Sequence, residues 1–357
     1  MDRRVRGALN TLLGVSLVAL PMPAESLAHT DPSVASSPRA TSDHPTINFA
    51  SSPDATSDPP TINLAPVRIL DRAALAPLPK FANRPFAISW VTIRTLAWAD
   101  LPLNGKALLG LKFGAGTDSD GIAYKVIDGR RVYSPGNLAE SGIRYVDGYV
   151  RTGDPAYLDR AVVRAKKLIS LSRLSGGARY FPYKYDYARE RLKAPWYSAY
   201  SQGFALSLFV RLYRVTGLQA WANRARETAM SFRRLGRVTR PWVAYVVNRR
   251  LWLEEYPSAT PTHVLNGFNF ALFGLYDYER LTRDRTARDL LRGALRTIRS
   301  YGTTYRRPGG ISYYDLVHRT RHAHYHLIHT WQLRALAEIS GDSWYRSLAA
   351  AYWRDYH

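Results

Sequence analysis

The sequence predicts an all-α protein, an incomplete (α/α) barrel, or toroid, built from helical hairpins. Three observations support this fold class. Apolar residues recur at helical spacing in paired segments, a short tripeptide separates the two segments of each pair, and the pairs repeat along the chain. Because long insertions separate the pairs, a toroid of inner and outer helices is favoured over a thin solenoid, with short β-hairpins or loops from the insertions lining a cleft.

The repeat is clearest where one predicted helix ends and the next begins. Similar tripeptides stand at these points, and their starts lie 64, 66 and 58 residues apart. Such breaks in an apolar pattern mark helix ends. The tripeptides are Thr152-Gly153-Asp154, Thr216-Gly217-Leu218, Thr282-Arg283-Asp284 and Ser340-Gly341-Asp342.

Each tripeptide follows an apolar helical pattern and precedes a more amphipathic one. We interpret each pair as a helical hairpin that buries its apolar face against its neighbours. The apolar patterns cover Leu138–Arg151, Ser201–Val215, Asn266–Leu281 and Leu327–Ile339, and amphipathic ones cover Ala156–Ser170, Leu218–Arg233 and Arg285–Tyr301.

The N-terminal part of the chain predicts export followed by a spacer. Residues 1–28 combine a basic start, the apolar run Leu12–Leu20 and small residues, as in a secretory signal peptide, so we expect a secreted or extracytoplasmic protein. A transmembrane anchor is the alternative, but the run is too short to span a bilayer comfortably, so no membrane insertion is expected. Residues 29–65 form a Ser/Thr/Pro-rich tandem repeat typical of a disordered linker, 66–130 an N-terminal lead-in segment, and 131–357 the toroid.

Composition narrows the classes of chemistry and partner. The chain has no cysteine, which excludes disulfides, thiolate nucleophiles and Cys-based zinc sites. Its formal net charge of +22 favours a polyanionic partner, namely nucleic acid, an acidic glycan or a membrane surface, and the predicted export argues against nucleic acid. An arginine excess that reflects genomic base composition is the alternative explanation.

The long insertions all enter the repeat just before the first helix of a hairpin, so in a toroid they converge on one rim. Helix N-termini at that rim offer unpaired N–H groups and partial positive charge, which suit a carboxylate. The 24 Tyr and 9 Trp residues suit both a core and a sugar-binding cleft. The insertions end at Val132–Pro135, Pro195–Ser198, Glu254–Pro257 and Tyr313–His326.

Three stretches of this rim carry motifs in a fixed order. They are Trp196-Tyr197-Ser198-Ala199 with Gln202-Gly203, then Glu254-Glu255-Tyr256-Pro257 with Val264–Gly267 and Gly274–Asp277, then Tyr314-Asp315-Leu316 with His318, Tyr325-His326, His329 and Gln332-Leu333. Together they resemble the D-glucuronyl C5-epimerase family, whose members convert glucuronate to iduronate within heparan-type chains. The resemblance covers residues 130–340 and implies an isomerase that acts on an acidic, heparosan-like polysaccharide without a cofactor.

By this resemblance Glu255, Tyr256, Tyr314 and Tyr325 are catalytic. Epimerisation at C5 removes a proton from one face of the sugar and returns one to the other, so an acid and a base must flank the ring. A tyrosine phenolate is a strong base, but its ordinary pKa is about 10, so neighbouring cations must lower that pKa for it to act near neutrality. The basic groups that would do this, or would neutralise the substrate carboxylate, are His318, Arg319, Arg321, His326 and His329.

The candidate sugar contacts are Tyr133, Trp196, Tyr197, Gln202 and Asn266, although Trp196 and Tyr197 could simply pack the barrel wall. The imidazoles between residues 322 and 329 are spaced closely enough for zinc, but no acidic ligand stands nearby, so we predict no metal site. A fragment at residues 118–121 resembles a calcium loop without its remaining oxygen ligands, and we interpret it as a turn.

Two features depart from the family pattern. Val317 stands where the family motif YDLRH has an arginine, so either Arg319 or Arg321 replaces that arginine or the substrate differs. Only residues 65–130 precede the repeats, so part of the binding surface is trimmed or is supplied by a second subunit in a homodimer. A polysaccharide lyase, which also begins by removing the C5 proton, and a non-catalytic protein that binds acidic glycans are the alternative functions.

Overall fold

The computed structural model describes residues 67–104, 116–236 and 241–357. The predicted signal peptide and linker lie outside these residues, as does part of the lead-in segment. In the described part of the chain eight α-helices form four consecutive hairpins, which confirms the all-α class, and no helix there has the length and apolarity to cross a bilayer. The hairpins are α2 Pro135–Thr152 with α3 Pro155–Leu171, α4 Ala199–Thr216 with α5 Gln219–Arg233, α6 Leu265–Thr282 with α7 Arg285–Tyr301, and α8 Ala323–Ser340 with α9 Ser343–Asp355.

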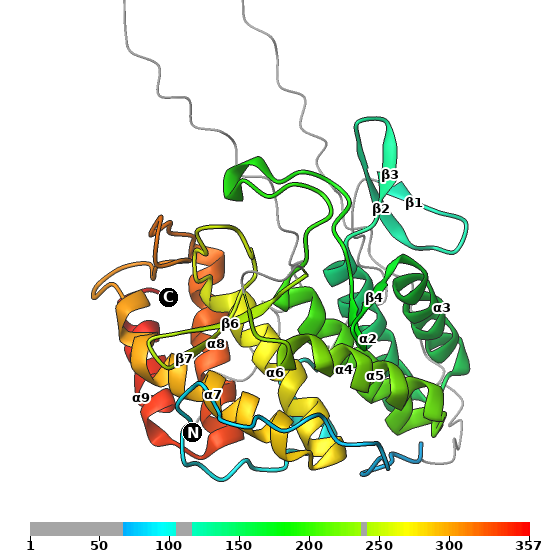
Figure 1. Ribbon diagram of the computed structural model, residues 1–357, viewed down its shortest axis with the longest axis horizontal. Helices are drawn as coiled ribbons and strands as arrows, with labels where there is room; N and C mark the ends of the chain where they lie inside the picture. Colours follow the sequence, from blue (N-terminus) through cyan, green and yellow to red (C-terminus); the bar gives the residue numbers. More distant parts are fainter. Residues whose placement is uncertain (1–66, 105–115, 237–240) are drawn as a thin grey trace, which may run out of the picture. The chain divides into compact units, whose positions relative to one another are not determined.

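The first helix of each hairpin is an inner helix and the second an outer one. Helices α2, α4, α6 and α8 lie side by side in chain order, and each packs against its own hairpin partner (Figure 1). The inner helices α4 and α6 are buried around most of their circumference, whereas the outer helix α7 buries one apolar stripe. The arrangement is the predicted incomplete (α/α) barrel.

The insertions before α2, α4 and α6 contain short antiparallel strands, which confirms the β-hairpins predicted in the insertions. Three 3₁₀ turns, η1 Trp98–Asp100, η2 Ala188–Glu190 and η3 Gly302–Tyr305, complete the secondary structure of the described residues. The strands are β1 Gly116–Thr117, β2 Ala123–Ile127 and β3 Arg130–Val132 in one sheet, β4 Arg173–Ser175 with β5 Ala178–Tyr180, and β6 Ala244–Val247 with β7 Arg250–Leu253.

The repeated tripeptide forms the tight turn within each hairpin. The Thr152 hydroxyl donates to the Gly148 carbonyl at 2.8 Å and accepts the Asp154 N–H at 3.2 Å. Gly153 takes the left-handed conformation at φ 73°, which a glycine adopts without strain, and Asp154 caps α3 by accepting the Ala156 N–H. The same pair of hydroxyl bonds recurs at Thr216, Thr282 and Ser340.

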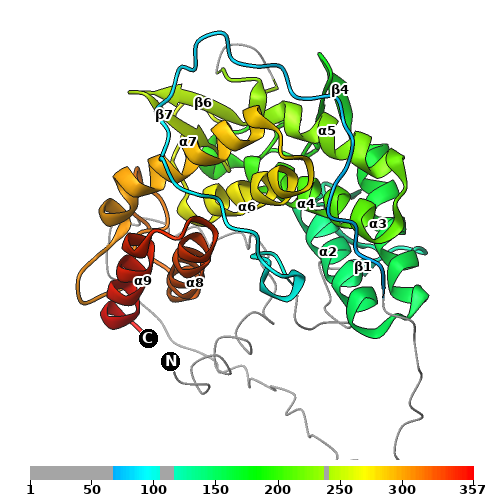
Figure 2. The ribbon, with the colours of Figure 1, turned by 90° about the horizontal axis from the view of Figure 1, so that it is seen from below.

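Residues 67–97, which we call the strap, run across the C-terminal ends of the inner helices (Figure 2). The last carbonyl groups of a helix have no partner within it, and the strap supplies N–H donors to them. These bonds run from Leu70 to the Arg214 carbonyl of α4, from Ala73 to the Leu281 carbonyl of α6, and from Arg94 to the Ile339 carbonyl of α8. The strap thereby ties three of the hairpins together at the end opposite the predicted rim.

Arginine side chains fix the strap in return. Guanidinium groups of α4, α5, α6 and α7 donate to strap carbonyls at 2.6–3.2 Å. Part of the arginine excess therefore has a structural role, because five donors in a planar fork suit the open carbonyls of an extended segment. The pairs are Arg214 with Leu70, Arg226 with Ala76, Arg233 with Pro79, Arg280 with Ile93 and Arg292 with Val91.

Candidate active site

A cluster of aromatic side chains lies where the inner helices begin. The insertions before α4, α6 and α8 all contribute to it, and the insertion before α2 reaches it through a hydrogen bond between Ser134 and Tyr183. The predicted convergence on one rim is thereby confirmed. The members used below are Tyr183 and Trp196 before α4, Tyr256 before α6, Tyr314 before α8 and Tyr325 in the first turn of α8.

Glu255 is a buried carboxyl group beside this cluster. The Tyr314 hydroxyl donates to its Oε1 at 3.4 Å, while Oε2 is buried without a hydrogen-bond partner. Burial raises the pKa of Glu255 to about 7, although the hydrogen bonds of Tyr256 and Tyr314 act in the opposite direction. A carboxyl group with a pKa near neutrality can both accept and release a proton at physiological pH.

Gly267, in the first turn of α6, leaves the space that Glu255 occupies. A Cβ atom on Gly267 would lie 2.0 Å from Glu255 Oε2 and 2.7 Å from Glu255 Cβ. We therefore expect Gly267→Ala to displace the carboxylate and to lower catalytic activity at least about 10-fold, since small misplacements at an active site are costly. Steady-state rates across pH measure this effect.

Gly310→Ala is the matched control, because its Cβ would meet only the end of the flexible Arg307 side chain. Its activity should stay close to that of the wild type. If Gly267→Ala keeps both the rate and the pH profile of the wild type, the carboxylate is not held against α6 as described.

The tyrosines around Glu255 are held as neutral phenols. The Tyr256 and Tyr314 hydroxyls lie 3.4 Å apart, so a chain of polar contacts joins both phenols to Glu255. Burial, and after it the charge of Glu255, raises the pKa of Tyr256, Tyr314 and Tyr325 above the ordinary value. The expectation that the predicted cations lower these pKa values is therefore wrong, since desolvation dominates at all three tyrosines and the charge of Glu255 adds to it. These tyrosines are suited to donate protons.

The segment between β5 and α4 adds aromatic residues that none of the motifs includes. Tyr183 stacks on Trp196 with 4.0 Å between ring centroids, and the Tyr187 ring lies 5.2 Å from that of Tyr256. The Trp196 indole donates to the Tyr185 carbonyl, so its polar atom is bonded within the segment. Tyr183, Tyr185 and Tyr187 stand at every second position, and such residues in an extended chain point to the same side. This spacing is the sequence signal from which an aromatic surface could have been predicted.

Asp315 organises the loop that carries the predicted cations. Its Oδ1 accepts the Val317 and Arg319 N–H groups at 3.0 and 3.3 Å, and its Oδ2 accepts the Thr320 hydroxyl at 2.8 Å. The His318 ring lies 3.9 Å from the buried carboxylate of Glu190. The side chains of Val317, His318, Arg319 and Arg321 are exposed.

Three predicted contacts use their polar atoms inside the protein. The Gln202 amide accepts the Phe181 N–H and donates to the Arg179 carbonyl and the Ser231 hydroxyl. His326 bonds Ser312 through Nδ1 and the Tyr352 carbonyl through Nε2. The Nδ1 atom of His329 bonds the Ser312 hydroxyl. Burial lowers the pKa of His329 to about 3, so it is neutral. Within the described ranges no group of three or more His, Cys, Asp or Glu residues could hold a metal ion.

The other predicted sugar contacts are Tyr133, Tyr197 and Asn266. The Tyr133 hydroxyl donates to Asp118 at 2.7 Å, and Tyr197 packs edge-on against Tyr180. Asn266 is buried beside Gly267, and its Oδ1 has no hydrogen-bond partner. Asn266 is therefore the one of these three that lies next to Gly267, the residue that leaves space for Glu255.

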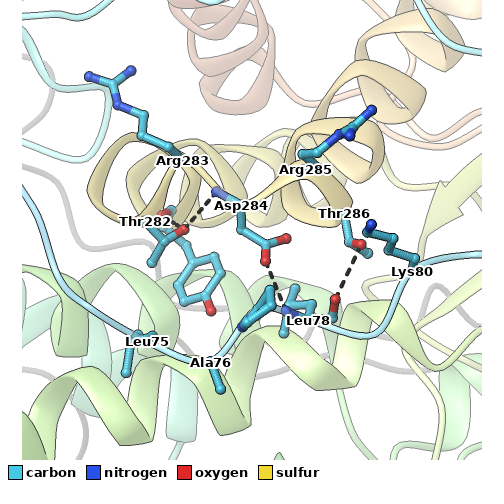
Figure 3. Close-up of a pocket in the computed structure, with 11 residues that line it drawn as sticks. Leu75, Ala76, Leu78, Lys80, Thr282, Arg283, Asp284, Arg285 and Thr286 are labelled. Carbon is cyan, nitrogen blue, oxygen red and sulfur yellow. Dashed lines mark hydrogen bonds between the residues drawn. The ribbon is translucent and has the colours of Figure 1, made fainter.

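A cavity of about 290 Å³ lies at the other end of α6, between the strap and the turn into α7 (Figure 3). Asp284 is fully engaged there, because its Oδ1 accepts the Ala287 N–H and its Oδ2 accepts the Leu78 N–H, each at 2.8 Å. The 18 residues of α6 separate this cavity from Glu255 by about 25 Å along the helix. None of the predicted site residues lines it.

The fold is an (α/α) barrel, and its rim carries a carboxyl group of near-neutral pKa beside protonated phenols. These features place the protein in the class of helical toroids that can carry out acid–base chemistry. The sequence profile described as D-glucuronyl C5-epimerase C-terminus matches residues 175–354. The chain belongs to this family, which is a family of carbohydrate epimerases and hence of isomerases.

Two curated relatives match part of the chain. An uncharacterised protein of Methanocaldococcus jannaschii is 27% identical over 166 residues, 46% of this chain and 53% of that protein. The D-glucuronyl C5-epimerase of Caenorhabditis elegans is 26% identical over 182 residues, 45% of this chain and 29% of that enzyme. The match thus spans about half or less of each relative's length.

Solved structures of low sequence identity superimpose on part of the chain. The cellobiose 2-epimerase of Spirochaeta thermophila superimposes with a TM-score of 0.47 at 16% identity, covering 72% of this chain and 65% of that chain. A GH76 α-mannanase of Bacteroides thetaiotaomicron gives a TM-score of 0.45 at 11% identity, covering 66% of this chain and 61% of that chain.

Proposed function

We propose that this protein is a C5-epimerase that converts D-glucuronate to L-iduronate residues within an acidic, heparosan-like polysaccharide. The observation that carries the proposal is the contact between Glu255, whose pKa is about 7, and Tyr314, one of several phenols that burial keeps protonated. Proton exchange at carbon needs a base and an acid that are each in the required protonation state near neutral pH. Family membership supports the choice of C5.

In the proposed reaction Glu255 removes the C5 proton. The Tyr314 hydroxyl, which donates to Oε1, orients the carboxylate for this step. The electron pair of the broken C–H bond moves into the substrate carboxylate and gives an enediolate. Preorganised donors stabilise such developing charge.

Tyr325 is the phenol proposed to return a proton to C5 from the opposite face. Its ring packs 4.6 Å from that of Tyr314, and it is only half-buried, whereas Tyr256 and Tyr314 are buried. The phenolate that remains takes a proton from water while Glu255 releases its own, so the enzyme returns to its starting state. One C5 proton is exchanged and the C4 bond is kept.

Helix ends support an anionic substrate. The inner helices α4, α6 and α8 begin at the cluster without a side-chain N-cap hydrogen bond. The outer helices α3, α7 and α9 are capped by Asp154, Asp284 and Asp342. The first N–H groups of α4 and α6 bond to the Glu254 and Tyr314 carbonyls, so the support comes from the positive ends of the three helix dipoles, which lie at the cluster where the uronate carboxylate is proposed to bind.

Heparosan in heavy water tests the proposal. We expect the wild-type protein to place deuterium at C5 without shortening the chains, because the intermediate is reprotonated. Tyr325→Phe is expected to lower the rate of exchange by about 10²–10⁴-fold, the range for loss of a general acid. Mass spectrometry and NMR of the polymer measure both quantities.

Tyr149→Phe, which changes a half-buried tyrosine in α2, is the matched control and should leave exchange unchanged. Shorter chains with an unsaturated, ultraviolet-absorbing end would instead show a lyase. Salt-sensitive binding of the polymer without exchange would show a non-catalytic glycan-binding protein. Either result contradicts the proposed function.

A further inference from the structure

The segment from Phe181 to Ser198, which we call the excursion, lies against the loop that carries Asp315. Backbone bridges between Tyr183 and Trp196 and between Tyr187 and Leu192 make it a hairpin, with the turn η2 near its tip. Figure 1 draws it in green, beyond the helix starts. The two elements are joined by Arg189, whose Nη2 donates to the Thr320 hydroxyl at 3.3 Å.

Negative charge accumulates at this junction. Glu190 is 6% exposed, burial raises its pKa, and its charge in turn raises the pKa of Glu255. Asp315 is buried as well, and the loop N–H groups and Thr320 compensate it. A uronate would bring another carboxylate into this field, and a buried anion is costly without a cation beside it.

Arg189 is placed to be that cation. Its Nε lies 3.7 Å from Glu190 Oε1, and its side chain is 27% exposed, so its remaining N–H donors can reach a ligand. Burial raises the pKa of Tyr187 and of Tyr325, and the charge of Arg189 acts against this shift, so the guanidinium stands within electrostatic range of the proposed acid.

The cations predicted on the neighbouring loop are placed differently. The Arg319 guanidinium lies over the Tyr313 ring, 5.6 Å from its centroid. Val317 is 49% exposed and apolar. Arg189, which its hydrogen bond to Thr320 places beside this loop, therefore supplies a cation that is anchored at the junction.

We infer that Arg189 binds the carboxylate of the uronate being epimerised, with Glu190 and Thr320 holding its guanidinium in position. The inference deepens the proposed function and rests on it for the identity of the substrate. A guanidinium presents two parallel N–H donors that match a carboxylate, and it stays charged at all relevant pH values. By neutralising the carboxylate it stabilises the enediolate, which acidifies the C5 proton.

A coupling experiment tests Arg189 directly. Titration calorimetry is performed with a heparosan hexasaccharide and with its carboxyl-reduced form, in which glucose replaces glucuronate. We expect Arg189→Ala to weaken binding of the acidic form about 30-fold or more, the effect of removing one partner of a buried charge pair, and to leave binding of the reduced form nearly unchanged. A non-zero coupling between residue and carboxylate isolates their interaction.

The matched control is Arg191→Asn, which removes one positive charge from the same excursion. Arg191 is exposed and has a φ of 51°, a conformation that asparagine tolerates. This variant should bind both hexasaccharides as the wild type does. Arg189→Lys should restore only part of the affinity, because lysine lacks the fork, and added guanidinium should partly rescue C5 exchange by Arg189→Ala.

The outcomes separate the inference from the proposed function. If the wild type prefers the acidic hexasaccharide and Arg189→Ala abolishes that preference, Arg189 is the carboxylate ligand, even where no deuterium enters C5 and the epimerase proposal fails. If Arg189→Ala weakens both ligands equally, or if the wild type does not distinguish them, the inference is overturned.

Discussion

At pH 8, Glu255→Gln is expected to abolish C5 exchange and at the same time to stabilise the folded protein. The loss of exchange should exceed about 10³-fold, because an amide cannot take the proton. The gain in stability follows from the pKa, which is about 7 in the folded protein against an ordinary value of 4.5. Because the folded pKa is raised, the contribution of Glu255 to stability is fully present below about pH 4.5. It is lost as the pH rises through about 7, and the total loss of unfolding free energy is about 3 kcal/mol.

Chemical denaturation at pH 5 and pH 8 measures this effect. The free-energy difference between variant and wild type is expected to be below about 1 kcal/mol at pH 5 and to exceed about 2 kcal/mol at pH 8. Glu338→Gln is the control, because its ion pair with Arg346 is 55% exposed on both sides and contributes at most about 1 kcal/mol. Retained exchange, or a gain that does not grow with pH, is incompatible with Glu255 as the base.

The helical hairpins are predictable from the sequence because each is encoded locally. The tripeptide at Thr152 closes one helix through a hydroxyl, turns at Gly153 and caps the next helix through Asp154, all within a few residues. The strap is not predictable in this way. Its extended backbone has no periodic pattern, and its carbonyls are bonded by arginines far away in the chain, such as Arg226 and Arg292.

The candidate site was predictable to the extent that its residues belong to motifs at helix starts. The motifs place Glu255 and Tyr314 on separate insertions, and only the fold shows their hydroxyl–carboxylate contact. Arg189 and Glu190 lie outside every motif, on a hairpin whose position depends on packing against another loop. The direction of the tyrosine pKa shifts could not be predicted either, since it depends on burial, which composition does not reveal.

Arg211→Met is expected to lower the free energy of unfolding by about 3–5 kcal/mol, the cost of breaking a buried ion pair by removing one partner. Arg211 is 0% exposed on α4. Its Nη1 bonds both oxygens of Asp147 on α2, at 2.9 and 3.1 Å, and its Nε bonds Asp277 on α6 at 3.3 Å. Removal of the guanidinium leaves two buried carboxylates without this cation. Thermal and chemical denaturation measure the loss, and Arg346→Met in the exposed pair with Glu338 should change stability by at most about 1 kcal/mol.

The triple variant Arg211→Met, Asp147→Asn, Asp277→Asn shows whether the cost comes from the uncompensated charges. With all three groups neutral it should recover most of the lost stability, because replacing a complete buried ion pair by neutral groups is often nearly neutral. Asp277 lies 12 residues beyond the first residue of α6, about 18 Å along the helix, so C5 exchange should be retained below the melting temperature. If Arg211→Met remains folded but loses exchange, the charge network acts on the catalytic rim as well as on the barrel, and Arg211 is then more than a structural residue.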